Sequence, residues 1–160
     1  MHDPGAPPVT LRRLKPGDVS WVRKLNALFG DAFQDRDTYE AEPPSDAYLE
    51  HLLAKEHVVA LVAVAGRELL GGLVAYELDK FERARSELYV YDLAVDKRYR
   101  RRGIATALIE NLKTIAAQRG AWVIYVQADY GDDPAIALYD KLGIREEVLH
   151  FDIRVAAPLG

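Results

Sequence analysis

The sequence predicts an α/β domain in which helices flank a mixed β-sheet, and two neighbouring patterns carry that prediction. Residues 88–95 are almost wholly apolar or aromatic on both alternating faces, as in a strand covered on both sides. From Ile104 to residue 119 the apolar positions recur three or four residues apart, which places them on one face of a helix. With a further apolar strand at 121–128, these segments form a crossover between two parallel strands.

The segments before this crossover predict shorter elements. An apolar face formed by Val22, Leu25, Leu28 and Phe29 indicates an early helix. Alternating apolar residues on either side of a glycine-containing turn indicate an antiparallel hairpin. In chain order we expect a strand at 9–14, the helix around 22–29, a polar loop at 33–44, a helix at 45–55, and strands at 57–64 and 69–78 joined by a turn at 66–68.

The segments after the crossover predict one more helix and one more strand. A short helix at 134–142 is stopped by Gly143. Residues 144–155 alternate well enough to form a last strand. We therefore expect a flexible leader at 1–8, a single domain at 9–155 and a tail at 156–160.

Composition restricts the class of protein. The chain has 160 residues, of which 49% are apolar, and no apolar run approaches the roughly 20 residues that span a bilayer. The leader lacks the features of a secretory signal, so we expect a cytoplasmic protein without a membrane partner. The absence of cysteine excludes a cysteine nucleophile and thiolate metal ligands. The four histidines show no metal-binding spacing, and we expect no metal.

Charge is distributed unevenly along the chain. A formal net charge of −4 argues against a general nucleic-acid binder. Residues 97–102 hold five bases and no acid, whereas residues 31–50 hold seven acids and one base. The domain is therefore expected to offer one site for an anion and one for a cation. The seven acids are Asp31, Asp35, Asp37, Glu40, Glu42, Asp46 and Glu50.

The anion site is expected at the turn Arg100-Arg101-Arg102-Gly103, directly before the helix at 104–119. The first N–H groups of a helix have no partner within it and are normally capped by Ser, Thr, Asp or Asn. Here arginines and a glycine occupy those positions, so the free amides and guanidinium groups can hold a polyphosphate. A solvated basic turn is the alternative, and these residues by themselves leave both interpretations open.

Two motifs together resemble the GCN5-related N-acetyltransferase superfamily. Its coenzyme loop, Arg/Gln-x-x-Gly-x-Gly/Ala, is matched by Arg100, Gly103 and Ala105. Its second signature, Ala-x-x-Leu-Tyr-x-Lys-x-Gly, is matched by Ala135, Leu138, Tyr139, Lys141 and Gly143. Within the superfamily, segments 86–95, 124–135 and 143–153 resemble the aminoglycoside 3-N-acetyltransferases of the gentamicin-modifying type. Asp129 and Asp132 depart from the asparagines that are usual at those positions.

This resemblance implies a fold, a reaction and partners. The fold is a mixed, mostly antiparallel sheet with one central parallel strand pair, splayed at the coenzyme site and flanked by helices. The reaction is direct acetyl transfer, in a ternary complex, from acetyl-CoA to the 3-amino group of a polycationic aminoglycoside. Coenzyme A is the second product, antibiotic resistance is the consequence, and a homodimer is the expected assembly.

The resemblance also implies residue roles. The main chain of Leu93 to Val95 would pair with the pantetheine arm, with the Val95 amide facing the thioester carbonyl, and the Tyr139 hydroxyl would protonate the departing thiolate. The coenzyme-binding residues are then Leu93, Ala94, Val95, Arg100, Arg101, Arg102, Gly103, Ile104, Ala105, Thr106, Asp132, Ala135, Leu138 and Tyr139.

The general base is less defined, and three carboxylates compete for the role. Alternation along the strand places Asp92 on one face with Leu88, Val90 and Ala94, where apolar surroundings would raise its pKa. Glu87 would lie on the opposite face, and Asp152 on the last strand. A structural hydrogen-bond acceptor or a ligand for a substrate ammonium is an equally open interpretation of each.

Acidic clusters are expected to bind the acceptor, because a carboxylate-lined cleft concentrates a polycation. The candidates are Asp129, Asp132, Asp133, Glu146, Glu147 and Asp152, with some of the acids at 31–50. Acetylation of a polyamine or another small cationic amine fits the same charges. A non-catalytic acyl-CoA-binding module fits the phosphate loop and leaves Tyr139 unexplained.

Overall fold

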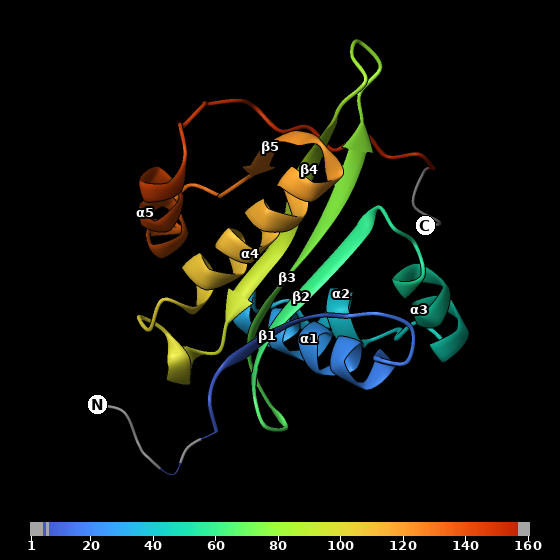
Figure 1. Cartoon of the computed structure of the whole chain (residues 1–160), viewed down its shortest axis with the longest axis vertical. Coiled ribbons are helices and arrows are strands. Elements are labelled where there is room, and N and C mark those ends of the chain that lie inside the picture. The colour runs from blue at the N-terminus through green and yellow to red at the C-terminus, as the bar shows by residue number, and fades with distance from the viewer. Residues whose placement is uncertain (1–4, 6, 157–160) are drawn as a thin grey trace. The chain divides into compact units, whose positions relative to one another are not determined.

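The computed structural model describes residue 5 and residues 7–156 (Figure 1). Most of the expected leader and tail therefore lies outside the described residues. The chain divides after Gln127 into two parts, which are considered separately below. Among the described helices, none combines the length and apolar character that a membrane span requires.

The first part contains a five-stranded mixed sheet, as predicted. Neighbouring strands pair antiparallel, except for β4 and β5, which pair in parallel. The sheet order follows the chain order: β1 (Thr10–Arg13), β2 (Val58–Ala65), β3 (Glu68–Asp79), β4 (Ser86–Val95) and β5 (Ala121–Val126).

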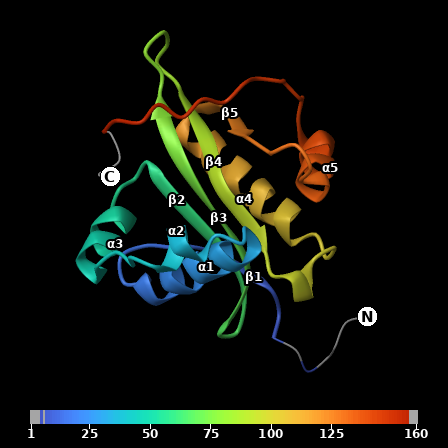
Figure 2. The same ribbon diagram turned by 180° about the vertical axis from the view of Figure 1, so that it is seen from behind.

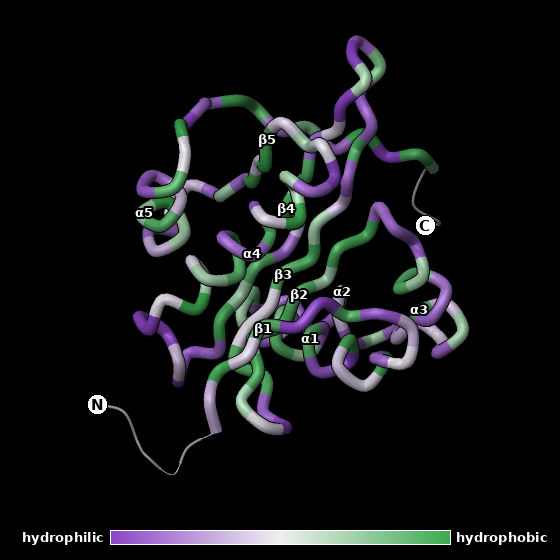
Figure 3. The backbone as a smooth tube through the Cα atoms, viewed as in Figure 1, coloured by the Kyte–Doolittle hydropathy of each residue, from purple (hydrophilic) through white to green (hydrophobic). Residues whose placement is uncertain are grey.

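Helices cover both faces of this sheet. Figures 1 and 2 show α4 (Ile104–Arg119) against one face and α1 (Val19–Ala32) against the other. All eight residues of β2 are Val, Ala or Leu, so the strand is coloured as hydrophobic in Figure 3, and seven of them are buried. Apolar side chains from both layers form two cores, one beneath α4 around Leu88 and Leu108 and one beneath α1 around Phe29.

The close packing of α1 on the sheet depends on Gly72 in β3. A Cβ atom added to Gly72 would lie 2.4 Å from Leu25 Cδ1 and 2.8 Å from the Leu61 carbonyl oxygen. A side chain there would collide both with Leu25 of α1 and with the backbone oxygen of Leu61 in β2, which cannot give way without moving the strand. The close approach therefore needs glycine at this position.

The predicted polar loop at 33–44 is wrong in part, since it contains a short helix, α2 (Arg36–Glu40). The Asp35 side chain accepts a hydrogen bond from the Thr38 amide and so caps α2. Phe33 stacks on Phe29 at a ring-centroid distance of 5.7 Å, and Tyr39 lies 6.0 Å from the same ring. This aromatic contact holds α2 against α1. A second helix, α3 (Asp46–Leu53), follows with Ser45 as its cap.

The parallel pair separates before β4 ends. Pairing between β4 and β5 stops at Val90↔Val126, whereas β3 stays paired with β4 as far as Val95. A 3-10 turn, η1 (Lys97–Tyr99), then leads toward α4, which ends at the left-handed Gly120 as predicted. One edge of β4 therefore has no paired strand over residues 91–95 of the described chain.

Over its described residues, 128–156, the second part contains one helix, α5 (Asp133–Leu142). The predicted last strand at 144–155 is wrong for this structure, because residues 143–156 hold no strand. Their apolar side chains are exposed, with Phe151 at 77% and Ile153 at 89%. Alternating apolar and polar residues allow a strand to bury one of its faces, but a strand also needs backbone hydrogen bonds to a neighbouring strand. Without a sixth strand, the parallel pair lies at the edge of the sheet.

Candidate active site

An irregularity in β4 decides which side chains face which helix. Asp92 pairs with Val74, whereas Val90 pairs with the next residue of β3, Ala75, so Tyr91 is an extra residue and forms a β-bulge. Leu88 and Val90 lie in the core beneath α4. Beyond the bulge the alternation is reversed, and Ala94 belongs to the core beneath α1.

The bulge corrects the prediction that Asp92 shares a face with Leu88 and Val90. The Asp92 carboxylate instead accepts a hydrogen bond of 2.8 Å from the hydroxyl of Tyr39, on α2. Burial raises the pKa of Asp92, and the Tyr39 hydrogen bond opposes that rise. Within residue 5 and residues 7–156, no cationic side chain forms an ion pair with this carboxylate. Asp92 is therefore a half-buried acid held by a neutral donor.

Glu87, the second carboxylate of β4, has different partners. It lies 3.2 Å from the Lys80 ammonium and accepts a hydrogen bond of 3.2 Å from the indole N–H of Trp122. Glu87 interacts electrostatically with Tyr125, and Tyr125 stacks on Tyr89. Both tyrosines lie on the face of the sheet that carries Asp92, so Glu87 lies on that face too. The prediction of opposite faces is wrong for the same reason, the bulge at Tyr91. Glu87 is neutralised where Asp92 is not.

Tyrosines line this face, and the sequence reasoning missed them. The strand register aligns Tyr76, Tyr89 and Tyr125 across β3, β4 and β5. The rings of Tyr89 and Tyr125 stack at 4.6 Å, and Tyr91 packs edge-on against both Tyr76 and Tyr89. The abundance of tyrosine, nine against four phenylalanines, was a visible signal. Only the register shows that four of them form one surface.

The basic turn has the geometry that an anion site needs. Gly103 caps α4 in a left-handed conformation, φ +76°, and no side chain accepts a hydrogen bond from the first turn. Of the other helices, α2, α3 and α5 are each capped by an Asp or Ser side chain, whereas α1 also lacks a side-chain cap. A Cβ added to Gly103 would meet no atom within 4 Å, so the space before the helix is open. Free amides beside Arg100, Arg101 and Arg102 fit a pyrophosphate.

The unpaired edge of β4 fits the amide-containing arm of a coenzyme. Leu93, Ala94 and Val95 follow the point where β5 separates. An extended ligand with amide groups can hydrogen-bond to such an edge as an added strand does. The edge leads directly into η1 and the basic turn, so one elongated ligand could occupy both. Acetyl-CoA has this combination of pyrophosphate and pantetheine amides.

In the second part, Tyr139 lies on α5 and is half-buried. Burial raises its pKa to about 12, with a smaller contribution from the negative charge of Asp132. The Asp132 carboxylate caps α5 by accepting from the Ala135 amide at 3.3 Å. Asp152 lies 2.8 Å from His150. The remaining predicted residues of this part are on α5 or exposed around it: Asp129, Asp133, Leu138, Glu146 and Glu147.

Comparison with known families decides among these possibilities. The family model described as "Acetyltransferase (GNAT) family" matches residues 22–144. The chain belongs to the GNAT family of acetyltransferases. Its parallel β4–β5 pair and helix-flanked mixed sheet are the fold that the resemblance implied.

Relatives of this GNAT protein include two kinds of acetyltransferase. An N-alpha-acetyltransferase of Saccharolobus solfataricus is 30% identical over 149 residues, covering 86% of this chain and 80% of the relative. A crystal structure of an aminoglycoside acetyltransferase from an uncultured soil metagenomic sample is 55% identical, with a TM-score of 0.91 over 93% of this chain and 99% of that one. A second such enzyme, in complex with sisomicin, is 28% identical with a TM-score of 0.85, over 92% and 97% of the two chains.

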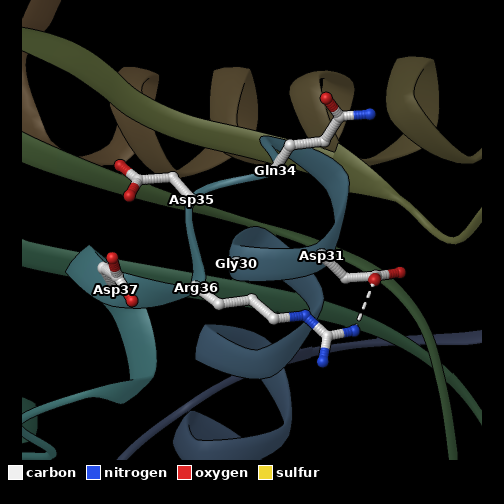
Figure 4. Close-up of a pocket in the computed structure, with 6 residues that line it drawn as sticks. All are labelled: Gly30, Asp31, Gln34, Asp35, Arg36 and Asp37. Atoms are coloured by element: carbon white, nitrogen blue, oxygen red, sulfur yellow. Dashed lines mark hydrogen bonds and ion pairs between the residues drawn. The ribbon is translucent and has the colours of Figure 1, made fainter.

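The first three acids of the segment 31–50, Asp31, Asp35 and Asp37, line a hollow of about 390 Å³ between α1 and α2 (Figure 4). Asp31 pairs with Arg36 at 2.9 Å across it, and Asp35 is the cap of α2. Farther along, Asp46 pairs with Arg23, and Glu50 accepts from the Gly17 amide. Several of the seven acids therefore stabilise local structure.

Proposed function

We propose that this GNAT enzyme transfers the acetyl group of acetyl-CoA to the 3-amino group of a gentamicin-type aminoglycoside, by direct transfer in a ternary complex. The observation that carries the proposal is Asp92, a half-buried carboxylate at the open edge of β4, for which the described residues supply no counter-ion. Likeness to two aminoglycoside acetyltransferases, at 55% and 28% identity, supports the acceptor class. Antibiotic resistance, a cytoplasmic location and a homodimeric assembly belong to the same proposal.

The donor side uses main-chain groups. Acetyl-CoA, when bound, supplies an activated thioester carbonyl. The backbone of Leu93 to Val95 would align the pantetheine arm, and the Val95 N–H would stabilise negative charge that develops on the carbonyl oxygen. The amides of residues 101–106, with the side chains of Arg100 and Arg102, would hold the pyrophosphate. The uncapped start of α4 supports this role.

Asp92 is the preferred base. Because burial raises the pKa of Asp92, that pKa lies closer to the pKa of an ammonium group. The rise favours transfer of a proton from the substrate ammonium to the carboxylate, directly or through water. Glu87 is a weaker candidate because its Oε1 atom already pairs with the Lys80 ammonium and accepts a hydrogen bond from Trp122. Asp152, with His150 beside it, remains a third candidate.

Tyr139 is the proposed acid, and its coenzyme contacts would be shared by Ala135 and Leu138. Its pKa is raised to about 12, so the hydroxyl is protonated at neutral pH, as a proton donor must be, although the rise also makes it a weaker acid than an exposed tyrosine. The exposed carboxylates of the second part would attract the polycationic acceptor: Asp129, Asp132, Asp133, Glu146, Glu147 and Asp152.

The proposal is tested by following thiol release from acetyl-CoA with purified protein and sisomicin, spermidine or no acceptor. We expect turnover with sisomicin well above the other two, and NMR of the product should place the acetyl group on the 3-amino nitrogen. Preference for spermidine would indicate a polyamine acetyltransferase. Coenzyme binding without turnover would indicate a non-catalytic module, and absence of coenzyme binding would overturn the assignment of the basic turn.

Replacing Tyr139 tests the assigned acid. Tyr139→Phe should lower kcat by roughly tenfold or more, because the thiolate loses its proton donor, and should change the KM for acetyl-CoA by less than about twofold. Tyr130→Phe is the matched control, since Tyr130 belongs to the same part and is 89% exposed. Equal kcat values for Tyr139→Phe and the unaltered enzyme would remove Tyr139 from the mechanism.

A further inference from the structure

We propose that four tyrosines of the sheet and Asp92 form a binding site for a protonated amino sugar. The tyrosine platform, defined as Tyr76, Tyr89, Tyr91 and Tyr125, would contact the sugar ring, and Asp92 would pair with its ammonium group. This inference rests on the proposed function and adds the side chains that would recognise the acceptor. None of these tyrosines belongs to the acidic clusters expected from the sequence.

The platform is continuous across three strands. Tyr125 stacks on Tyr89 with an interplanar angle of 7°, and Tyr91 contacts Tyr89 edge-on at 5.7 Å. Tyr76 continues the row, with its ring centroid 6.0 Å from that of Tyr91. The Tyr89 hydroxyl donates to Gln127 at 2.7 Å, which fixes the ring orientation. Mutual packing therefore holds the rings in place before any ligand binds.

The platform remains accessible although its rings are packed. Tyr91 is 61% exposed, and the other three rings are partly exposed. The core beneath α1 lies farther along the sheet, around Ala94, Val74 and Val62. A row of aromatic rings open to solvent is costly to leave uncovered, because it keeps apolar area in contact with water.

Asp92 supplies the charge that selects the ligand. Its carboxylate interacts electrostatically with Tyr39, Tyr76 and Tyr89, so these three side chains lie near it. Tyr39 donates the hydrogen bond that holds it, and no ion pair within the described chain neutralises it. Rings around a partly desolvated negative charge form the kind of cage that binds organic ammonium groups, through charge pairing and cation–π attraction.

Charge and shape together favour an amino sugar over other cations. The flat, apolar rings of Tyr89 and Tyr125 match the C–H face of a saturated six-membered ring. A linear polyamine would satisfy Asp92 but would leave the platform uncovered. An uncharged sugar would cover the platform but leave Asp92 without a counter-ion. Only a ring that carries an ammonium group fulfils both conditions.

Calorimetry with three probes separates the two contributions: sisomicin, spermidine and the uncharged disaccharide trehalose, each titrated into the full-length protein without acetyl-CoA. We expect sisomicin to bind most tightly. Tyr89→Leu should weaken sisomicin by about tenfold and leave spermidine within about threefold. Asp92→Asn should weaken sisomicin and spermidine alike and leave trehalose unchanged.

Two further variants control for indirect effects. Tyr89→Phe keeps the ring and loses only the hydroxyl that bonds to Gln127, so it should bind sisomicin within about threefold of the unaltered protein. Phe81→Leu removes a fully exposed aromatic ring from the loop between β3 and β4 and should change nothing. Circular dichroism and titration with coenzyme A check that each variant is folded.

The outcomes distinguish this inference from the proposed function. One outcome is that coenzyme A binds while sisomicin binds with the same affinity to three proteins: the unaltered protein, Tyr89→Leu and Asp92→Asn. In that case the platform is not the acceptor site. The same holds if sisomicin does not bind at all. If sisomicin binding depends on these residues but acetyl transfer is absent, the binding site stands and the proposed reaction fails.

Discussion

The two faces of β4 have opposite characters although they belong to one strand of ten residues. Beneath α4, Leu88 and Val90 are buried in an apolar core. On the other face, Tyr89 is partly exposed and Asp92 is held by a tyrosine hydroxyl. The bulge at Tyr91 separates the two patterns. One face of β4 therefore contributes to the apolar core, and the other carries the residues of the proposed chemistry. The bulge residue Tyr91 determines which face the side chains after it occupy.

Insertion of an alanine between Val74 and Ala75 of β3 should have the largest effect on this arrangement. The added residue gives Tyr91 a partner and removes the bulge, so regular alternation would turn Asp92 toward the core beneath α4. Because an unpaired buried charge costs several kcal/mol, we expect a loss of more than about 4 kcal/mol in unfolding free energy, or no folded protein. Urea denaturation followed by circular dichroism measures this. A folded insertion variant with nearly full activity would show that the bulge is dispensable.

Leu88→Ala tests the buried face alone. A cavity beneath α4 should lower the unfolding free energy by about 2–5 kcal/mol, while kcat/KM measured well below the melting temperature should stay within about threefold. Leu78→Ala is a suitable control, since Leu78 is 43% exposed and should cost less than about 1 kcal/mol. Comparable losses of activity and stability in Leu88→Ala would mean that the two faces are not independent.

Asp92→Asn should have the smallest effect on stability, and it should stabilise the protein, whereas the two preceding changes destabilise it. Folding raises the pKa of Asp92, so ionisation of this group opposes folding, and the cost disappears when pH falls below its unfolded pKa. The variant should therefore be more stable than the unaltered enzyme at pH 7, and the difference should vanish near about pH 3.5. Urea denaturation at both values checks this. Greater stability of the unaltered enzyme at pH 7 would contradict the uncompensated charge.

The sequence was sufficient for the elements with strong periodicity. The change of period between residues 88–95 and Ile104 predicted β4 and α4, and the arginines before Gly103 predicted a helix start without a side-chain cap. These features are local, so neighbouring residues determine them. The motifs around Gly103 and Tyr139 then indicated the family that the comparison established.

What the sequence could not provide depends on pairing between distant segments. Alternation continues plausibly through Tyr91, so only the register with β3 reveals the bulge and the direction of Asp92. The tyrosine platform likewise joins residues from three strands. For residues 144–155, alternation is the same whether or not a neighbouring strand supplies hydrogen bonds. The five-residue helix α2 is too short to show a helical period, and its contact with Phe29 depends on Tyr39.

If the start of α4 binds coenzyme A as proposed, the stability of the protein would depend on the supply of that coenzyme in the cell. Backbone donors that no side chain satisfies leave the unliganded chain less stable than a capped one would be. A polyanion bound there shifts the folding equilibrium by mass action, in proportion to the logarithm of its concentration. Degradation in a cell would therefore be slower when the coenzyme A pool is large and faster when it is depleted.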